Sequence, residues 1–303
     1  MTLNDFKNVY QNMRTMYEKN PDQNIIPEHL YQNENLFLTS VWDLYLPLSQ
    51  ILVQKQKVVT KKKQITVCGV VGPQGSGKTL MSKMLANSLA TLNKNVVFMS
   101  SDDFYLPFEK RLKLRKDKPF LTQRGPPGTH DLELIESVMD KLNSPIKKGE
   151  KLEIPIFDKS LHNGEGDRSG FKTIENLDQV EFAIFEGWYT GFKPVPLDKL
   201  KTVTDLSKYS NEQLSLYKNW DFLDSLIAVI PDNYQNSYKW RIEAEKRMGG
   251  GMTEEKLRKF VGYFFESLHP EVYYNDLIAR NPENLELILK LNENHELVHA
   301  EAM

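Results

Sequence analysis

The sequence is poor in cysteine, and it lacks long apolar runs and a clear excess of charge of one sign. Cys68 is the single cysteine among 303 residues, so no disulfide can form within the chain, which suits a reducing compartment. No apolar run approaches the ~20 residues that span a bilayer, and residues 1–7 lack the apolar core of a signal peptide. Lysine and arginine number 39 and aspartate and glutamate 41, a net charge of −2 that gives no general attraction to nucleic acid or anionic membrane. We therefore expect a cytosolic protein with no nucleic-acid or membrane partner.

The most informative stretch that the sequence does contain is a phosphate-binding loop. The pattern G-x-x-x-x-G-K-[ST] is matched by Gly72, Pro73, Gln74, Gly75, Ser76, Gly77, Lys78 and Thr79. In this pattern backbone N–H groups surround a polyphosphate, Lys78 reaches the β- and γ-phosphates, and the Thr79 hydroxyl binds Mg²⁺. An apolar, β-branched run at 64–71 predicts a buried strand before the loop, with Cys68 as a small buried residue, and helical spacing from Leu80 to Leu92 predicts a helix after it. The sequence therefore predicts an ATP- and Mg²⁺-binding site.

Residues 1–60 precede the phosphate loop and have a different character. Apolar residues recur at helical spacing near the start of the chain and again from Leu38 to Leu46, where Pro47 ends the pattern. We expect an N-terminal helical extension over 1–60 that packs on a main domain over 61–303, the alternative being a surface for a partner. The basic run that includes Lys55, Lys57 and 61–63 is interpreted as a solvated linker, with a nucleic-acid contact as the alternative.

The rest of the chain alternates between predicted strands and predicted helices. Strands are expected at 95–100, 152–157, 180–185 and 226–230, a late edge strand at 285–291, helices at 132–142 and 236–248 and from Thr253, and loops at 105–130 and 163–168. This alternation predicts an α/β fold of the P-loop NTPase type, with a mainly parallel sheet and helices on both faces.

Acidic residues follow two of the predicted strands, at the edge where ligands bind in such sheets. Glu186 comes directly after a buried strand and is placed to hold Mg²⁺ together with Thr79. Asp102 follows the second strand and is placed to accept a proton from a substrate hydroxyl, with Asp103 in support. The alternative is that both aspartates only end the strand and cap the next turn.

Cations in the two loops rich in glycine and proline fit an anionic substrate, because guanidinium groups bind carboxylates well. These residues are Arg124, His130, Lys159 and Arg168, and the alternative is a set of solvated loop charges. Trp188 next to Glu186 either lines the substrate pocket or packs in the core.

A helix that ends at a run of three glycines carries further cations. Trp240, Arg241, Lys246 and Arg247 lie on it, and the glycines at 249–251 could act as a hinge. One interpretation is a lid that brings Arg241 or Arg247 to the ATP phosphates, and the other is a solvated helix face.

The segment His295–His299 matches H-E-x-x-H, which on a helix places two imidazoles on one face for Zn²⁺. No His, Asp or Cys follows it to supply a third ligand, so a frayed, solvated tail is the interpretation that we prefer.

Taken in order, several short motifs resemble the D-glycerate 3-kinase family of plants and cyanobacteria, including its fungal ATP-binding kinase-like relatives. They are the phosphate loop, Ser101–Tyr105, Arg124–Asp131, Phe157–Ser160, Gly166–Arg168, Glu186–Trp188, Trp240–Arg241 with Glu245, and Gly251–Thr253. The chain is more distantly similar to uridine kinase, phosphoribulokinase and bacterial pantothenate kinase.

The resemblance implies an ATP- and Mg²⁺-dependent kinase that phosphorylates a hydroxyl of a small acidic metabolite, with D-glycerate as the first candidate. It implies catalytic roles for Lys78, Asp102 as the base, and Glu186 on the metal side. It also implies substrate contacts for Asp103, Tyr105, Arg124, His130, Lys159, Arg168 and Trp188. A nucleoside, pantothenate or another sugar acid as acceptor, or an ATP-binding switch without turnover, remain the alternatives. No Asn-Lys-x-Asp element for reading guanine is present.

Overall fold

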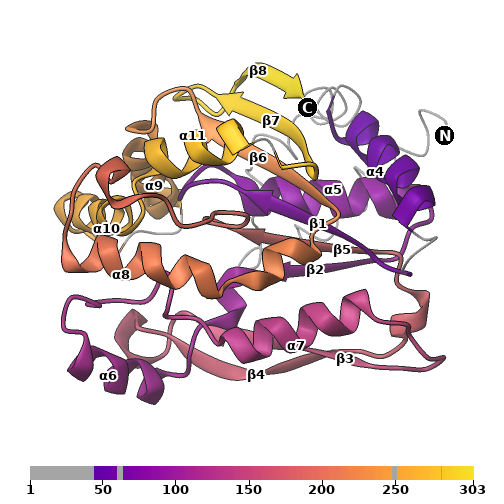
Figure 1. The fold of residues 1–303 in the computed structure, drawn as a ribbon, viewed down its shortest axis with the longest axis horizontal. Helices are drawn as coiled ribbons and strands as arrows, with labels where there is room; N and C mark the ends of the chain where they lie inside the picture. Colours follow the sequence, from indigo (N-terminus) through magenta and orange to yellow (C-terminus); the bar gives the residue numbers. More distant parts are fainter. Residues whose placement is uncertain (1–43, 60–63, 248–250, 281) are drawn as a thin grey trace.

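The computed structural model describes residues 44–59, 64–247, 251–280 and 282–303. The helical spacing at 1–43 and the lysines at 61–63 therefore lie outside the described residues. Within the described part the chain forms an α/β structure with one main sheet, a separate hairpin and helices around them (Figure 1).

The main sheet has six strands in the order β2-β5-β1-β6-β7-β8. Their bounds are β1 Thr66–Val71, β2 Val96–Ser100, β5 Phe182–Gly187, β6 Ser225–Pro231, β7 Leu285–Leu291 and β8 Leu297–Ala302. All neighbours pair in parallel except β8, which runs antiparallel to β7. The sheet is thus mainly parallel, as the sequence predicts, and β1 with its phosphate loop lies at its centre.

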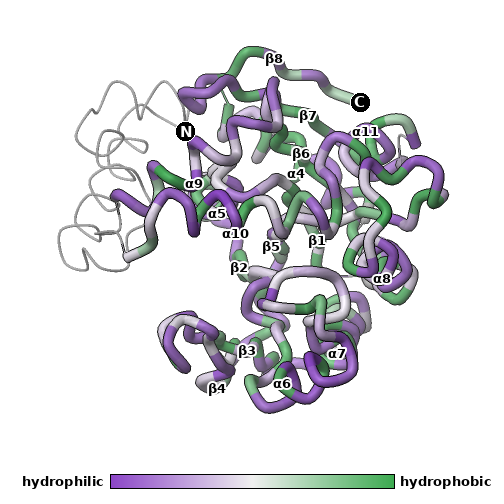
Figure 2. Tube along the Cα trace, turned by 90° about the vertical axis from the view of Figure 1, so that its left-hand side faces the viewer, coloured by the Kyte–Doolittle hydropathy of each residue, from purple (hydrophilic) through white to green (hydrophobic). Residues whose placement is uncertain are grey.

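Helices cover both faces of this sheet, which confirms the predicted layers. On one face α4 (Leu46–Val59) and α5 (Lys78–Thr91) pack on Cys68, Val70 and their neighbours. The other face is covered by α7 (Leu132–Asn143), α10 (Glu254–Ser267) and α11 (Pro270–Arg280), which pack on the alternate residues of the same strands. Apolar segments gather around β1, β5 and β6 in the middle of the molecule (Figure 2). Cys68 is fully buried there, and burial raises the pKa of its thiol to about 12.

The predicted helix boundary at Pro47 is wrong. Pro47 lies in the first turn of α4, a position where its missing N–H costs nothing, and the helix continues to Val59. Lys55 and Lys57 therefore belong to a helix and not to a linker, and Lys55 pairs with Glu286 of β7.

The strand predicted at 152–157 forms, but it lies outside the main sheet. It is β3 (Leu152–Asp158), and it pairs antiparallel with β4 (Asp167–Ile174) to form a two-stranded sheet. The loop predicted at 163–168 therefore ends early, because Asp167 and Arg168 already begin β4. Most side chains of β4 are exposed or half-exposed, so the strand carries no apolar alternation that could reveal it.

The loop predicted at 105–130 is interrupted by α6 (Phe108–Asp117). Its single buried side chain is Arg111, whose guanidinium donates to the carbonyls of Leu106, Glu165 and Gly166. A helix held by an arginine shows no apolar period, which is why the pattern was missed. Together α6 and the β3–β4 hairpin lie at the end of the molecule opposite β7 and β8 (Figures 1 and 2).

Two predictions near the end of the chain are corrected as well. The strand β7 is not an edge, because β8 lies beside it. The tail is not frayed, because Leu297–Ala302 pairs along β7 as the edge strand. The helix predicted at 236–248 forms as α9 (Asn236–Arg247), and residues 248–250, which include two of the glycines predicted to end it, lie outside the described part. The helix α8 (Asp205–Gln213), to which the sequence analysis assigned no element, begins with a capping box made by Thr204 and Ser207.

Candidate active site

The phosphate loop joins β1 to α5 at the carboxyl edge of the sheet. Gly75 and Gly77 both have φ of 80°, a left-handed conformation that glycine adopts without steric cost. A Cβ atom on Gly75 would lie 2.6 Å from Cβ of Trp240, so α9 leaves no room for a side chain there. A Cβ atom on Gly77 would have no atom within 4 Å, so this side of the loop faces open space. The loop thus has a packed outer side and an open side at the start of α5, where an anion is favoured.

Thr79 and Glu186, the residues predicted to hold Mg²⁺, lie against each other. The Thr79 hydroxyl donates to Oε1 of Glu186 over 3.1 Å, and the Ser100 hydroxyl donates to the same oxygen over 2.7 Å. Glu186 is only 3% exposed, and its Oε2 is buried without a hydrogen-bond partner. A buried carboxylate oxygen without a partner beside a hydroxyl suits Mg²⁺, which binds oxygen ligands. The residues present therefore fit a magnesium ion.

Asp102 lies in the short 3₁₀ helix η3 (Ser101–Phe104) that follows β2. Its Oδ2 is 2.5 Å from the ammonium of Lys159, and its Oδ1 accepts a hydrogen bond of 3.1 Å from the hydroxyl of Tyr105. Burial would raise the pKa of Asp102, but the charges of Lys159 and Lys78 outweigh it and hold the pKa well below its usual value. Asp102 is therefore ionised at neutral pH and lies within the field of the phosphate-loop lysine.

The pKa of Asp103 is shifted in the opposite direction from that of Asp102. Burial and the Asp102 carboxylate raise the pKa of Asp103 to about 6. The two adjacent acids thus titrate far apart, with Asp102 as the permanent anion and Asp103 partly protonated near neutral pH.

Three of the predicted substrate residues, Arg124, His130 and Arg168, lie around Tyr105. The His130 ring packs on the Tyr105 ring in a tilted arrangement with centroids 4.4 Å apart, and the Arg124 guanidinium lies 5.9 Å from the centre of the Tyr105 ring. Nη2 of Arg168 lies 3.3 Å from its carbonyl oxygen and 2.9 Å from Oδ2 of Asp131. The loop that carries Arg124 and His130 is thereby brought against η3 and the β3–β4 hairpin, although the three come from distant parts of the chain.

His130 is a buried, neutral imidazole. Burial lowers its pKa to about 3, and its Nδ1 lies 2.8 Å and 3.2 Å from the hydroxyls of Tyr189 and Tyr217. A hydroxyl that donates to Nδ1 leaves the proton on Nε2, which is buried without a hydrogen-bond partner. Nε of Arg168 is likewise buried without a partner. Both are donors available to an acceptor oxygen next to Tyr105.

Arg124 and Trp188 support the same loop from different sides. Arg124 donates to the carbonyls of Gly164 and Glu165, so it ties the loop to the hairpin. Trp188 is 6% exposed, its indole donates to the carbonyl of Gly125 over 3.2 Å, and its ring packs edge-on against Phe264. Trp188 therefore contacts the loop from within the core.

The helix α9 places its predicted cations on different sides. Arg241 pairs with Glu245 at 3.0 Å and lies over Phe260, whereas Lys246 is exposed. Arg247 is the last residue of α9, and its side chain lies outside the described part. Glu245 also accepts the backbone N–H groups of Gly251 and Met252, so it holds the chain beyond the glycines close to the helix.

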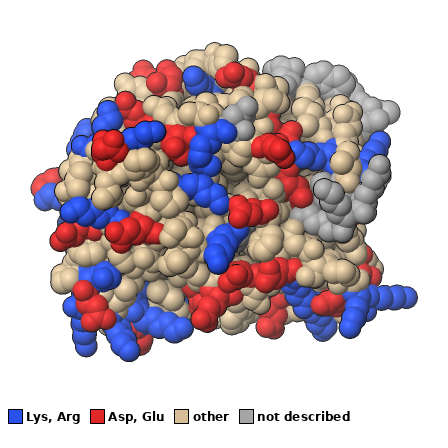
Figure 3. Space-filling view, in the orientation of Figure 1, with Lys and Arg blue, Asp and Glu red and all other residues tan. Residues whose placement is uncertain are grey.

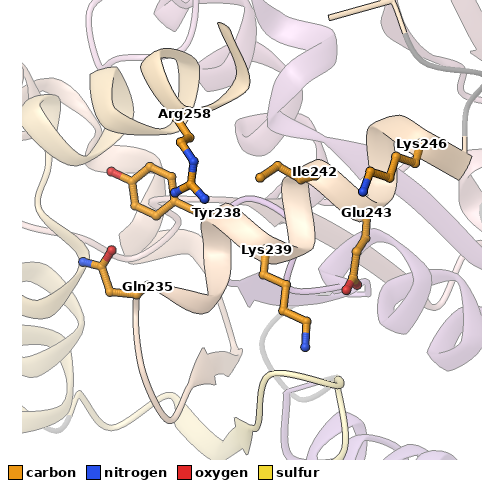
Figure 4. Close-up of a pocket in the computed structure, with 7 residues that line it drawn as sticks. All are labelled: Gln235, Tyr238, Lys239, Ile242, Glu243, Lys246 and Arg258. Atoms are coloured by element: carbon orange, nitrogen blue, oxygen red, sulfur yellow. The ribbon is translucent and has the colours of Figure 1, made fainter. Parts of the chain in front are cut away.

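An open hollow of about 310 Å³ lies on α9 and α10, away from the phosphate loop and Asp102. Its lining consists of Gln235, Tyr238, Lys239, Ile242, Glu243, Lys246 and Arg258 (Figure 4). On the face seen in Figure 3, acidic and basic side chains are interspersed.

The sequence analysis missed four residues that shape this site. Ser100 binds Glu186, to which it is opposite in the β2–β5 register, and Tyr189 and Tyr217 hold His130. His295 donates to the carbonyl of Gly75 in the phosphate loop. Only Ser100 had a local signal, as a hydroxyl residue at the end of a predicted strand, because the other three reach the site by tertiary packing.

Comparison with known proteins finds kinases that are similar in sequence. The chain is 33% identical over 226 residues to the chloroplastic D-glycerate 3-kinase of Arabidopsis thaliana, which covers 71% of this chain and 49% of the plant protein. It is 32% identical over 258 residues to the uncharacterized kinase mug58 of Schizosaccharomyces pombe, which covers 77% of this chain and 91% of the relative. The chain thus spans about half the length of the plant relative and nearly all of the yeast one. No protein-family model matches the chain.

Solved structures that resemble the described structure are also kinases. The D-glycerate 3-kinase from Cryptococcus neoformans superposes with a TM-score of 0.75 at 28% identity, over 86% of this chain and 99% of that one. A putative P-loop kinase of Saccharomyces cerevisiae, YFH7, shares the fold at 13% identity with a TM-score of 0.52.

The fold, the phosphate loop and these neighbours define a P-loop kinase. The chain belongs to the D-glycerate 3-kinase family, which confirms the resemblance drawn from its motifs. In the part of the chain that the structure describes, no helix is both long and apolar enough to cross a bilayer.

Proposed function

We propose that this protein transfers the γ-phosphoryl group of ATP to a hydroxyl of a small acidic metabolite, with D-glycerate as the first candidate and 3-phosphoglycerate as the product. The observation that carries the proposal is the ionised Asp102. It lies in η3 within the field of Lys78, and the buried donors of His130 and Arg168 lie around the neighbouring Tyr105. A carboxylate next to cations and neutral donors fits an acceptor that carries both a hydroxyl and a negative charge.

In this mechanism the phosphate loop binds the ATP phosphates through its backbone N–H groups, and Lys78 contacts the β- and γ-phosphates. Thr79 and Glu186 would hold Mg²⁺, which supplies positive charge to the phosphate oxygens when it is bound. Arg241 and Arg247 are the candidates for a further cation at the nucleotide.

Asp102 would orient the acceptor hydroxyl and take its proton. As the acceptor oxygen bonds to the γ-phosphorus, the bond from that phosphorus to the bridging oxygen breaks, ADP leaves, and the hydroxyl proton passes to the Asp102 carboxylate. Because Lys159 holds the pKa of Asp102 low, the carboxylate gains basicity if Lys159 turns towards the acceptor or the phosphate.

The acidic part of the acceptor would lie next to Tyr105, Arg124, Lys159 and Arg168, with the Nε2 proton of His130 donating to one of its oxygens. Asp103 and Trp188 stay predictions as substrate residues: Asp103 lies next to the proposed base, and Trp188 supports the loop that carries Arg124. A cytosolic location and the division at residue 60 also stay predictions, and the name of the plant relative places that protein in the chloroplast.

The test is ATP consumption by the purified protein with Mg²⁺ against D-glycerate, L-glycerate, uridine, pantothenate and several sugar acids. We expect stimulation by D-glycerate, its loss by at least about 100-fold in Asp102→Asn because the proposed base is removed, and normal ATP binding by that variant. Asp140→Asn on the exposed side of α7 is the matched control and should behave as wild type.

Stimulation by another acceptor alone would replace D-glycerate and keep the mechanism. ATP binding without turnover on any acceptor would contradict the proposal and favour a regulatory ATP-binding protein.

A further inference from the structure

The turn between β7 and β8 contacts the phosphate loop through a histidine. Nε2 of His295 lies 2.7 Å from the carbonyl oxygen of Gly75. A carbonyl can only accept, so Nε2 carries the proton and donates it. When the N–H groups of a phosphate loop point at the anion, its carbonyl groups point outward and need their own partners. His295 is such a partner, and it comes from a segment more than 200 residues away in the sequence.

The imidazole is held in this position by α9. It stacks on the indole of Trp240 with ring centroids 4.5 Å apart and an interplanar angle of 25°. Trp240 is fully buried, its Cβ fills the space over Gly75, and its indole N–H donates to the carbonyl of Glu293 over 2.9 Å. Gly75, Trp240 and His295 therefore form one three-way contact between the phosphate loop, α9 and the β7–β8 turn.

The β7–β8 turn is held by hydrogen bonds within it and by contacts with α9. The N–H of His295 donates to the carbonyl of Asn292, and the N–H of Asn292 donates to the carbonyl of Glu296, both over 3.0 Å. Lys239 of α9 binds Asn294 at 3.2 Å and Glu293 at 3.3 Å, so a second contact fixes the turn to the same helix. His295 has φ of 62°, a conformation better suited to glycine, and the histidine is held there by the contacts of its side chain.

The H-E-x-x-H segment thus does not form the helical zinc site that its pattern suggests. His295 lies in a turn and His299 on an exposed strand, so the two imidazoles do not share a helix face. We propose that His295 is a positioning residue for the nucleotide: it holds the Gly75 carbonyl outward, which keeps the phosphate loop in its anion-binding shape and couples the loop to α9.

This inference rests on the proposed binding of ATP at the loop but not on the identity of the acceptor, so the test uses the nucleotide alone. Wild-type Mg-ATP binding is measured first, by calorimetry. Failure of the wild type to bind would contradict the proposed function itself. The variants are His295→Ala, His295→Gln, which keeps an N–H donor at a similar reach, and His299→Ala on the same hairpin as the matched control.

We expect His295→Ala to raise the dissociation constant of Mg-ATP by about three- to tenfold, the loss of one partly buried hydrogen bond. His295→Gln should restore most of the affinity, and His299→Ala should match the wild type. Because His299 is 52% exposed, its loss tests the hairpin without touching the loop.

Melting temperatures measured without and with Mg-ATP separate an effect on nucleotide binding from an effect on the stability of the fold. Under the proposal, saturating Mg-ATP raises the melting temperature of His295→Ala by less than it raises that of the wild type, and His295→Gln regains the difference. Unchanged ATP affinity in His295→Ala, or equal losses of affinity in His295→Ala and His295→Gln, would overturn the proposal.

Discussion

At the scale of single residues, the electrostatics of the site depend on the pair formed by Asp102 and Lys159. The carboxylate is 35% exposed and the ammonium 57%, yet they meet at 2.5 Å directly beside Tyr105. The Asp102 charge raises the pKa of Lys159, and the Lys159 charge lowers that of Asp102. Each group therefore keeps the other ionised over the neutral range.

Removing the cation tests this relation. In Lys159→Met the pKa of Asp102 rises, because burial is no longer outweighed by the ammonium, so the proposed base becomes protonated at a higher pH. We expect the acid limb of the kcat profile, at saturating acceptor, to move upward by about one to three pH units.

The control for this variant is Lys151→Met at the start of the same hairpin, where Lys151 forms an exposed pair with Glu175. Its profile should match the wild type. An acid limb that stays in place in an active Lys159→Met enzyme would show that Asp102 is not the titrating base.

The same residues show what sequence reasoning can reach. Thr79 and Asp102 follow strands whose apolar runs are visible in the sequence, and Glu186, predicted just after a strand, lies at the carboxyl end of β5 itself. The composition of their loops predicts that Arg124, His130 and Arg168 face an anionic substrate, but not that they lie around Tyr105. Tyr189 and His295 could not be predicted, because their contacts depend on how distant segments pack.

At the scale of elements, α6 contacts the β3–β4 hairpin through several groups: Arg115 pairs with Glu165, the Phe108 N–H donates to Asp167, and Arg111 is the buried member of the set. Arg111 is 2% exposed and binds the carbonyls of Leu106, Glu165 and Gly166, and burial lowers its pKa to about 10. Glu165 and its neighbour Gly164 also accept hydrogen bonds from Arg124. The position of α6 therefore affects the acceptor side of the site.

We expect Arg111→Met to lower the free energy of unfolding by on the order of 2 kcal/mol, since buried carbonyls lose a charged donor. The KM for the acceptor should rise while that for ATP stays constant, because the change lies on the hairpin side of the site.

Urea unfolding and steady-state kinetics measure these two effects. Lys116→Met on the exposed side of α6 is the control and should leave both unchanged. Wild-type stability in Arg111→Met would contradict the role given to the guanidinium.

The elements that were missed share a physical cause. The buried strand β1 and the helix α5 can be predicted from the spacing of their apolar residues. In contrast, α6 and β4 are held by polar contacts and show no regular spacing of apolar residues. The end signals of α6 are nevertheless present in the sequence, since Pro107 precedes the helix, Glu109 lies in its first turn and Arg115 in its last. The edge position of β8 has no local signal, because strand order depends on pairing between distant segments.

At the scale of the whole molecule, the site divides the sheet into two functional sides. The phosphate loop stands at the end of the central strand β1, between β5 and β6. The side proposed to bind the nucleotide is bounded by α9 and the β7–β8 turn, and the side proposed to bind the acceptor by η3, α6 and the β3–β4 hairpin. The β7–β8 pair lies at the top of the molecule in Figure 1, and α6 and the β3–β4 hairpin lie at the bottom. The layers of this fold were predictable from the alternation of strands and helices, but the separation of the hairpin from the main sheet was not.

The central claim is that this arrangement transfers a phosphoryl group from ATP to a small acidic alcohol. The most direct measurement is ³¹P NMR of the protein with Mg-ATP and D-glycerate, followed over time and repeated with Asp102→Asn. The account predicts that the γ-phosphate signal declines as ADP and a phosphomonoester on the C3 oxygen of glycerate appear together, and that the variant forms neither. Release of inorganic phosphate alone, or an equal rate of ester formation by Asp102→Asn, would contradict it.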